Sequence, residues 1–169
     1  MTADFRAMTV EDLPVMHTWL QREHVRRWWT KRDTLEDVAE HYLPTIEGRE
    51  PTELYFIILK GTPVGFIQTY LVSDYAEYQQ LVEVGDGVAG VDLFLAEEHQ
   101  LGKGLGTRVL EEFLQQVVFA VPTTDACIAD PDAENHASLR AFEKAGFTAV
   151  REFVDPADKR VHVLMRIQR

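Results

Sequence analysis

The sequence predicts an α/β domain, of the α+β kind, in which helices cover a mixed β-sheet. The main evidence is the order of its segments, because seven β-type and four amphipathic segments follow one another as β-α-α-β-β-β-α-β-α-β-β. The length of 169 residues indicates one domain, residues 1–169. A chain of that size hides roughly 70% of its unfolded surface, which is enough for a core. The composition, 46% hydrophobic and 27% charged, is typical of globular proteins.

The first third of the chain predicts one strand and two helices. Asp4–Met8 reads as a short strand. Apolar side chains then recur at helical spacing, which predicts a helix over Val10–Arg22. A second helix opens at Thr34, whose hydroxyl can cap it, and Pro44 and Gly48 are expected to end it.

Three strands and one long connection come next. Leu54–Leu59 and Val64–Val72 predict a hairpin around the turn Lys60–Pro63. The polar, acidic stretch Ser73–Gly87 predicts a loop, and loops of this length in compact domains are often functional. The apolar run Val88–Leu95 predicts the fourth strand.

The last third predicts two helices and three strands. Gly104–Val118 has an apolar stripe at helical spacing, and the short apolar run Asp125–Ala129 reads as a strand. Asn135–Ala145 predicts the final helix, which a glycine follows. Val150–Val154 and Val161–Ile167 predict the last two strands.

Composition disfavours several classes of protein. The net charge of -11 argues against nucleic acid or an anionic membrane as the main partner. The single cysteine, Cys127, rules out an internal disulfide, and its place in a strand indicates a buried apolar side chain. No apolar run reaches about 18 residues and no signal-peptide pattern is visible, so we expect a cytoplasmic protein. The six histidines show no metal-ligand spacing, so no metal site is expected.

The acidic residues are concentrated in the middle of the chain. Gly61–Leu139 contains 13 acids but only two basic residues, Lys103 and Arg108. This pattern indicates either a solvated acidic face or an acidic cleft that attracts a cation.

A glycine-rich motif connects the fourth strand to the following helix. The sequence of Gln100–Thr107 is QLGKGLGT, with glycine at alternate positions. Glycines let backbone N–H groups converge, and a helix N-terminus adds unpaired N–H groups and a positive dipole, so the motif suits a phosphate. Both isolated cations, Lys103 and Arg108, lie here. The alternative is a tight turn that needs glycine for its geometry alone.

The sequence resembles the GNAT N-acetyltransferases. The resemblance lies in Gly102–Gly106, Asn135 and Phe142–Phe147. The sequence resembles the aminoglycoside 6'-N-acetyltransferases in particular, through Val88–Asp92, Gln100–Thr107, Asp130-Pro131, Glu143–Phe147, Trp28-Trp29 and the second helix. The resemblance implies a GNAT-like sheet of about seven strands, mostly antiparallel, with a splay between strands 4 and 5 and about four flanking helices.

The resemblance also implies acetyl-CoA as cosubstrate, with its pantetheine arm in the splay and its pyrophosphate on the N–H groups of Leu101–Gly106. The family prefers Gln or Arg at the position of Leu101, whereas here Gln100 stands one residue earlier. The implied cosubstrate-binding residues are Leu93, Leu95, Gln100, Leu101, Gly102, Lys103, Gly104, Leu105, Gly106, Thr107, Asn135, Ser138, Phe142 and Lys144.

Two acids are the candidate catalytic residues. Asp92 lies inside an apolar strand, where an acid costs free energy unless it is paired or wet, and Asp130 ends the fifth strand. In the resembling enzymes these positions bind the substrate ammonium and help remove its proton, which the chemistry requires because only a neutral amine attacks a thioester. The alternatives are a hydrogen-bonded buried acid at Asp92 and an Asp-Pro turn at Asp130.

The resemblance further implies a substrate-binding set that takes a polycationic amino-sugar. It consists of Trp28, Trp29, Asp74, Glu77, Tyr78, Glu83, Asp92 and Asp130. The tryptophans either line the substrate cleft or belong to the core.

Phe142 departs from the family, which usually has a tyrosine there that protonates the leaving thiolate. Here the thiolate either leaves unaided or takes its proton from water or another residue, and Phe142 is otherwise a core residue of the helix.

The predicted function is therefore acetyl transfer to an aminoglycoside, at the 6'-amine, by direct attack in a ternary complex, with antibiotic resistance as the outcome. Alternatives are another amine substrate (another antibiotic, a polyamine or a siderophore precursor) and a catalytically weak CoA-binding domain. We expect a monomer or a homodimer.

Overall fold

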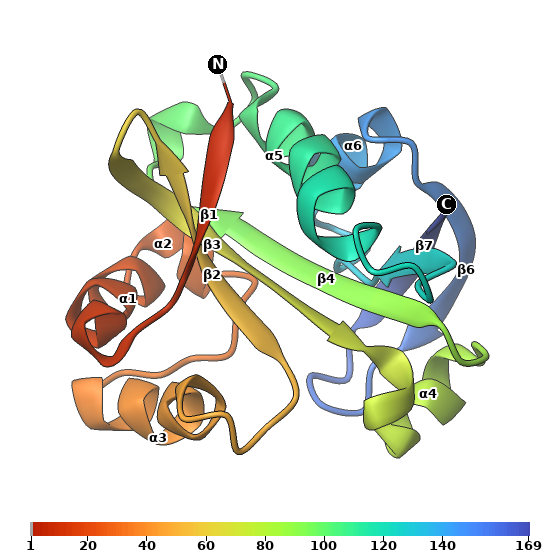
Figure 1. The fold of residues 1–169 in the computed structure, drawn as a ribbon, viewed down its shortest axis with the longest axis horizontal. Coiled ribbons are helices and arrows are strands. Elements are labelled where there is room, and N and C mark those ends of the chain that lie inside the picture. Colours follow the sequence, from red (N-terminus) through yellow and green to blue (C-terminus); the bar gives the residue numbers. More distant parts are fainter. Residues whose placement is uncertain (1) are drawn as a thin grey trace. The chain divides into compact units, whose positions relative to one another are not determined.

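The structure is a computed structural model and describes residues 2–169. Seven strands form one mixed sheet in the order β1-β2-β3-β4-β5-β7-β6, in which β4 and β5 are parallel. The strands are β1 (Ala3–Ala7), β2 (Glu53–Leu59), β3 (Thr62–Leu71), β4 (Val88–Leu95), β5 (Ala126–Ala129), β6 (Thr148–Val154) and β7 (Val161–Gln168). The α-helices are α1 (Leu13–Leu20), α2 (Glu23–Arg26), α3 (Leu35–Ile46), α4 (Ala76–Val82), α5 (Leu105–Phe113) and α6 (His136–Lys144) (Figure 1).

The chain divides into two compact units. The first comprises the described residues up to Gln68 together with Leu93–Gln100, and the second comprises Thr69–Asp92 and Leu101–Arg169. Within the described residues, no helix is both long and apolar enough to cross a membrane.

The core of the first unit is built largely from aromatic rings. Trp19 of α1 lies 4.7 Å from Phe56, ring centroid to centroid. Trp29 packs edge-on against Phe94 at 5.1 Å, and Tyr42 of α3 packs against Phe66. Such pairs contribute stabilisation beyond the area that they bury.

Two expectations for the first unit need correction. The predicted helix over Val10–Arg22 is a 3₁₀ turn, Val10–Asp12, followed by α1, and Arg22 is extended before α2 begins. Pro44 does not end the second helix. It removes only its own N–H donor, and Glu47 still donates to the Leu43 carbonyl at 2.9 Å, so α3 continues to Ile46.

The predicted loop Ser73–Gly87 is also partly wrong. It contains most of a 3₁₀ turn, Val72–Asp74, and the whole of α4. The helix forms because the end of this polar segment carries Val82, which is 2% exposed and packs with Val72. With α2 and α4, residues 2–169 contain six α-helices where about four were expected.

In the second unit, α5 and α6 lie side by side (Figure 1). A Cβ added to Gly106 of α5 would lie 3.7 Å from the Cβ of Ala141 on α6, an ordinary contact distance. The predicted helix Gly104–Val118 ends differently from expectation, because after α5 the residues Leu114–Val118 form a π-helical turn.

Gly90 of β4 lies directly against an aromatic ring. A Cβ at this position would stand 2.4 Å from Cζ of Tyr70 and 2.7 Å from its hydroxyl oxygen. The Thr69 hydroxyl donates to the Gly90 carbonyl at 2.8 Å, which fixes the strand backbone there. The absence of a side chain at Gly90 therefore makes room for the Tyr70 ring.

We expect Gly90→Ala to lower the free energy of unfolding by about 1–3 kcal/mol, because the Tyr70 ring must move. Urea denaturation measures the change. Gly85→Ala is the matched control, because a Cβ there meets nothing within 4 Å. Equal stability of the two variants would contradict the packing argument.

Candidate active site

Asp92 lies on β4, and Asp130 directly follows β5, the parallel strand beside it. The backbone pairing of β4 with β5 runs through Val88–Gly90 and ends where Gly90 lies opposite Ile128. Asp92 follows Gly90 by two residues, and Asp130 follows Ile128 by two. Side chains two residues apart on a strand share a face, so the two carboxylates project from the same side, just beyond the paired segment.

Asp130 lies in a polar but poorly solvated environment. The Tyr78 hydroxyl of α4 donates to its Oδ2 at 3.0 Å, and the Tyr70 hydroxyl is in turn hydrogen-bonded to Tyr78. Burial, followed by the negative charge of Asp92, raises the pKa of Asp130 to about 7, although the Tyr78 hydrogen bond and His162 partly oppose the increase. A carboxyl group with such a pKa can accept a proton near neutral pH.

The two tyrosines keep their protons. Burial and the nearby charges of Asp92 and Asp130 raise the pKa of both Tyr70 and Tyr78 well above the ordinary value. The tyrosine hydroxyls therefore act as hydrogen-bond donors along a chain that ends on Asp130. Tyr78 was predicted as a substrate-binding residue, and its observed partner is this acid.

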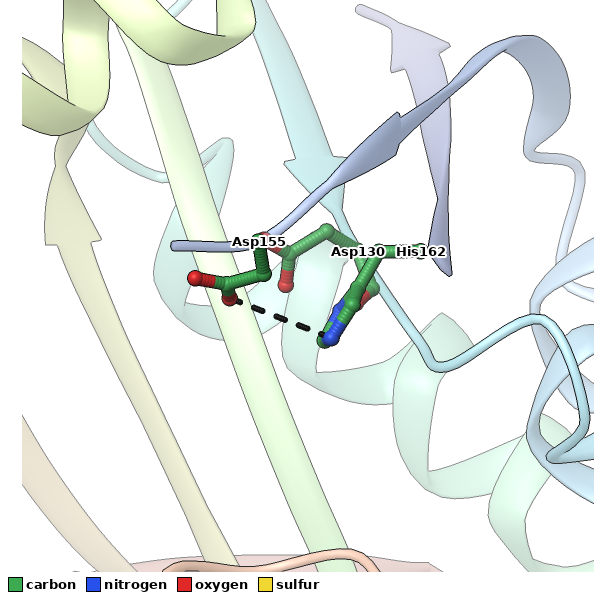
Figure 2. Close-up of side chains that lie close together, drawn as sticks. All are labelled: Asp130, Asp155 and His162. Carbon is green, nitrogen blue, oxygen red and sulfur yellow. Dashed lines mark hydrogen bonds and ion pairs between the residues drawn. The ribbon is translucent and has the colours of Figure 1, made fainter. Parts of the chain in front are cut away.

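On its other side, Asp130 adjoins a histidine and a second acid. Figure 2 shows Asp130, Asp155 and His162 grouped together, from the end of β5, the segment after β6 and strand β7. Nδ1 of His162 lies 2.6 Å from the backbone carbonyl oxygen of Asp130, and Nε2 lies 3.9 Å from Oδ2 of Asp155.

The same histidine belongs to two groups of three side chains whose ligand atoms lie within 4.8 Å of one another, Asp130–Asp155–His162 and Asp132–Asp158–His162. Both imidazole nitrogens already have hydrogen-bond partners, and exposed acidic groups of this kind are common without an ion. The expectation of no metal stays a prediction.

The glycine motif forms an open turn at the start of α5. Gly102 and Gly104 have φ of +72° and +79°, and a Cβ on either would meet nothing within 4 Å. Glycine is thus required here by backbone conformation rather than by crowding, and Gly104 is the N-cap of the helix. Lys103 and Arg108 are exposed beside this turn. The turn, its free space and its two cations fit a pyrophosphate.

The other predicted cosubstrate residues of the second unit lie on or before α6. Asn135 is the N-cap of this helix, and its side-chain oxygen accepts a hydrogen bond from the Ser138 N–H at 3.2 Å. Phe142 is 3% exposed and packs edge-on against Phe147, as its alternative reading as a core residue predicted. Lys144 is exposed in the last turn.

In the first unit, Leu93 and Leu95 lie at the end of β4, half-buried and buried respectively. Gln100 ends the 3₁₀ turn Glu98–Gln100, and its Oε1 atom is buried without a hydrogen-bond partner in the described part of the chain. Trp29 packs on Phe94, so at least one of the two tryptophans contributes to the core.

Trp28 is half-buried, with the Arg27 guanidinium 5.0 Å from its ring centroid.

The predicted acids of the long connection have separate environments. Asp74 and Glu77 are exposed on the 3₁₀ turn and on α4. Glu83, in the left-handed conformation after α4, lies 3.6 Å from an Arg151 nitrogen. Arg151 also donates to the Leu81 carbonyl, so Glu83 belongs to the attachment of α4 to β6.

Sequence reasoning missed three side chains near Asp130, namely Tyr70, Asp155 and His162. Tyr70 and His162 lie on strands whose residue spacing matches no catalytic motif, and Asp155 precedes a proline that marks only a turn. One signal was available, because a histidine inside the otherwise apolar stretch Val161–Met165 is unusual unless it has a polar partner.

Comparison with known proteins identifies the class to which this fold and site belong. Residues 9–154 match the family described as the acetyltransferase (GNAT) domain. The chain belongs to this GNAT acetyltransferase family.

Particular relatives narrow the comparison. The chain is 35% identical over 166 residues to the aminoglycoside N(6')-acetyltransferases type 1 of Klebsiella pneumoniae and Serratia marcescens, covering 96% of this chain and 82% of each relative. The structure of AAC(6')-Ib with paromomycin and acetyl-CoA matches with a TM-score of 0.90 at 33% identity, covering 100% of this chain and 94% of that one. The complex of AAC(6')-Ib with coenzyme A and kanamycin matches with a TM-score of 0.90 at 34% identity, covering 99% and 95%.

The raised pKa of Asp130 predicts a pH-dependent effect on stability. The folded protein holds this proton up to about pH 7, whereas the unfolded chain releases it near the ordinary aspartate pKa of 3.8. Ionisation of Asp130 therefore lowers the free energy of unfolding. The loss is small at pH 4, grows as the pH rises, and is complete once the pH has passed about 7. We expect Asp130→Asn to raise the free energy of unfolding by on the order of 2–3 kcal/mol at pH 8 and by less at pH 5.

Denaturant unfolding at the two pH values measures this difference, with the exposed Asp4→Asn as the control. A gain that is the same at pH 5 and pH 8 would show that Asp130 does not titrate as described.

Proposed function

We propose that the protein transfers the acetyl group of acetyl-CoA to the 6'-amine of an aminoglycoside and thereby confers resistance. The observation that carries this proposal is the pair Asp92 and Asp130, held on one face just beyond the paired part of β4 and β5. The relatives described as aminoglycoside N(6')-acetyltransferases support the choice of substrate. We further propose that residues 1–169 act as one catalytic domain and that the reaction takes place in the cytoplasm.

The cosubstrate side of the proposal rests on the turn before α5. Backbone N–H groups of Leu101–Gly106 would hold the pyrophosphate, with Lys103 and Arg108 supplying positive charge. The Asn135 side chain caps the start of α6 through the Ser138 N–H, and α6 lies against α5 where Ala141 approaches Gly106. Acetyl-CoA supplies the thioester that the amine attacks.

The amine side rests on the two acids. A protonated amine would first bind between Asp92 and Asp130, whose combined negative charge favours a cation. Because the pKa of Asp130 is about 7, this carboxylate can take a proton from the bound ammonium. The neutral amine then attacks the thioester carbonyl carbon, and the hydrogen bond from Tyr78 keeps the Asp130 carboxylate oriented.

The leaving group departs as a thiolate. Attack forms the C–N bond, and collapse of the tetrahedral intermediate breaks the C–S bond while the nitrogen loses its second proton. Phe142 cannot donate a proton, but a thiol with an ordinary pKa of about 8.5 leaves readily as the anion and takes its proton from water.

The decisive experiment is thiol release from acetyl-CoA with a panel of amines. The panel contains two aminoglycosides that differ only in an amine or a hydroxyl at the 6' position, a polyamine and an N-hydroxylated diamine of the siderophore-precursor type. We expect turnover with the 6'-amine compound alone. Preference for another member would redirect the proposal to that substrate, and no turnover despite tight CoA binding would support a CoA-binding domain instead.

We also expect Asp92→Asn to lower kcat/KM for the aminoglycoside by at least about 100-fold, because the ammonium loses a carboxylate partner and its proton acceptor is weakened. The dissociation constant for acetyl-CoA, measured by calorimetry, should not change. Asp125→Asn, an exposed acid just before β5, is the control and should retain activity. A near-normal rate in Asp92→Asn would refute the assignment.

A further inference from the structure

His162 of β7 is bound at both of its ring nitrogens. Nδ1 lies 2.6 Å from the backbone carbonyl oxygen of Asp130, and Nε2 lies 2.7 Å from Oδ2 of Asp158. The ring also stacks on Phe153 of β6, with centroids 5.8 Å apart and planes at 29°. An imidazole that donates from both nitrogens carries a positive charge.

The backbone around this contact is continuous with the sheet. Val163 N–H donates to the Pro131 carbonyl and Ala133 N–H donates to the Val161 carbonyl, both at 2.9 Å. The residues just after β5 are therefore held against the beginning of β7. His162 adds a side-chain hydrogen bond to this segment, at the backbone of Asp130. The Asp130 carboxylate interacts with Asp92 and Tyr78.

The charges around His162 are mostly negative. Burial alone would lower its pKa, but the hydrogen bond to the Asp130 carbonyl and the interactions with Asp158 and the Asp130 carboxylate outweigh burial, so the pKa of His162 is raised. Reciprocally, the His162 charge lowers the pKa of Asp130. The charged and titratable groups that surround this contact are Asp92 on β4, Tyr78 on α4, Asp130 and Asp132 after β5, and Asp155, Asp158 and Arg160 between β6 and β7.

Arg160, a neighbouring basic side chain, is bound to different acids. Its guanidinium pairs with Asp132 and with Glu134. His162 touches the Asp130 backbone and also lowers the pKa of the Asp130 carboxylate.

We propose that His162 is a positioning residue for the transfer reaction, which holds the Asp130 backbone through Nδ1 and, as an imidazolium, keeps the Asp130 carboxylate ready to accept the proton of the amine. This inference rests on the proposed acetyl transfer. His162 touches neither substrate nor cosubstrate in this scheme, and it acts through Asp130 alone.

Two neutral substitutions separate the positional from the electrostatic part of this role. In His162→Asn, the amide nitrogen can occupy the place of Nδ1 and still donate to the Asp130 carbonyl. In His162→Gln, the longer amide reaches the place of Nε2 and Asp158 but loses the carbonyl. Both remove the positive charge. His17→Asn is the control, because His17 also contacts a backbone carbonyl, that of Asp33, at 2.9 Å outside this cluster.

Loss of the charge should raise the pKa of Asp130, so the acidic limb of the kcat/KM profile should move to higher pH by about one unit in both variants. His162→Gln should also lose kcat at the pH optimum by several-fold, whereas His162→Asn should keep it. The control should follow the wild-type profile. Profiles of both variants that superimpose on that of the wild type would overturn the proposal.

A second measurement does not require turnover. The pKa of His162 can be followed by NMR in the wild type and in Asp130→Asn, which removes the carboxylate but keeps the backbone carbonyl. We expect a lower His162 pKa in Asp130→Asn, and an unchanged value would refute the coupling. If the wild type acetylates no aminoglycoside, the proposed function fails, while this titration still decides whether His162 and Asp130 act on each other.

Discussion

The placement of two like charges at the end of a parallel strand pair is the constraint on which the rest of the site depends. Asp92 and Asp130 stand in register beyond Gly90 and Ile128, where the backbone ladder has stopped. Two carboxylates in such a place repel each other and lose solvation, so one of them holds a proton near neutral pH. The free energy lost in this arrangement is recovered when a cation binds, because a substrate ammonium replaces the proton and offsets both charges.

The surroundings of the pair fit this interpretation. Tyr70 and Tyr78 donate hydrogen bonds in sequence toward Asp130 and do not ionise themselves. The missing side chain of Gly90 makes room for Tyr70, so a backbone feature of β4 contributes to the polar chain that reaches Asp130. On the opposite side, His162 places a positive charge in contact with the Asp130 backbone. Tyr78 and His162 thus offset part of the free-energy cost of ionising Asp130, and burial and the charge of Asp92 still outweigh them.

Much of this could be predicted from the sequence, for reasons that differ among residues. Strand β4 was predicted correctly from its nearly continuous apolar run, because a strand buried on both faces is largely apolar and shows no alternation of apolar and polar residues. The glycine turn was visible because positive φ restricts the residue type. Helix α4 was missed because only one of its residues is fully buried and its other residues resemble those of a loop.

The network at Asp130 could be predicted only in part. Asp92 and Asp130 stand out locally, as acids within or directly after apolar runs. Tyr70 and His162 do not, since their importance comes from strand pairing between segments that are far apart in the chain. A register such as that of β5 with β7 is set by the whole sheet and leaves no local trace in the sequence.

Phe142 stands where the GNAT family usually has a tyrosine, and this difference indicates which proton transfer requires a side chain. The ring is buried against Phe147, so α6 offers no proton at this position. In the overall reaction the substrate nitrogen loses two protons, one before attack and one as the thiolate departs. The second passes easily to water, because it leaves a cationic nitrogen that is strongly acidic, and the thiolate needs no donor to depart because the thiol pKa is only about 8.5. The first proton has to be removed from a basic amine, which holds it tightly. Asp92, Asp130 and the groups around them are arranged to assist this step.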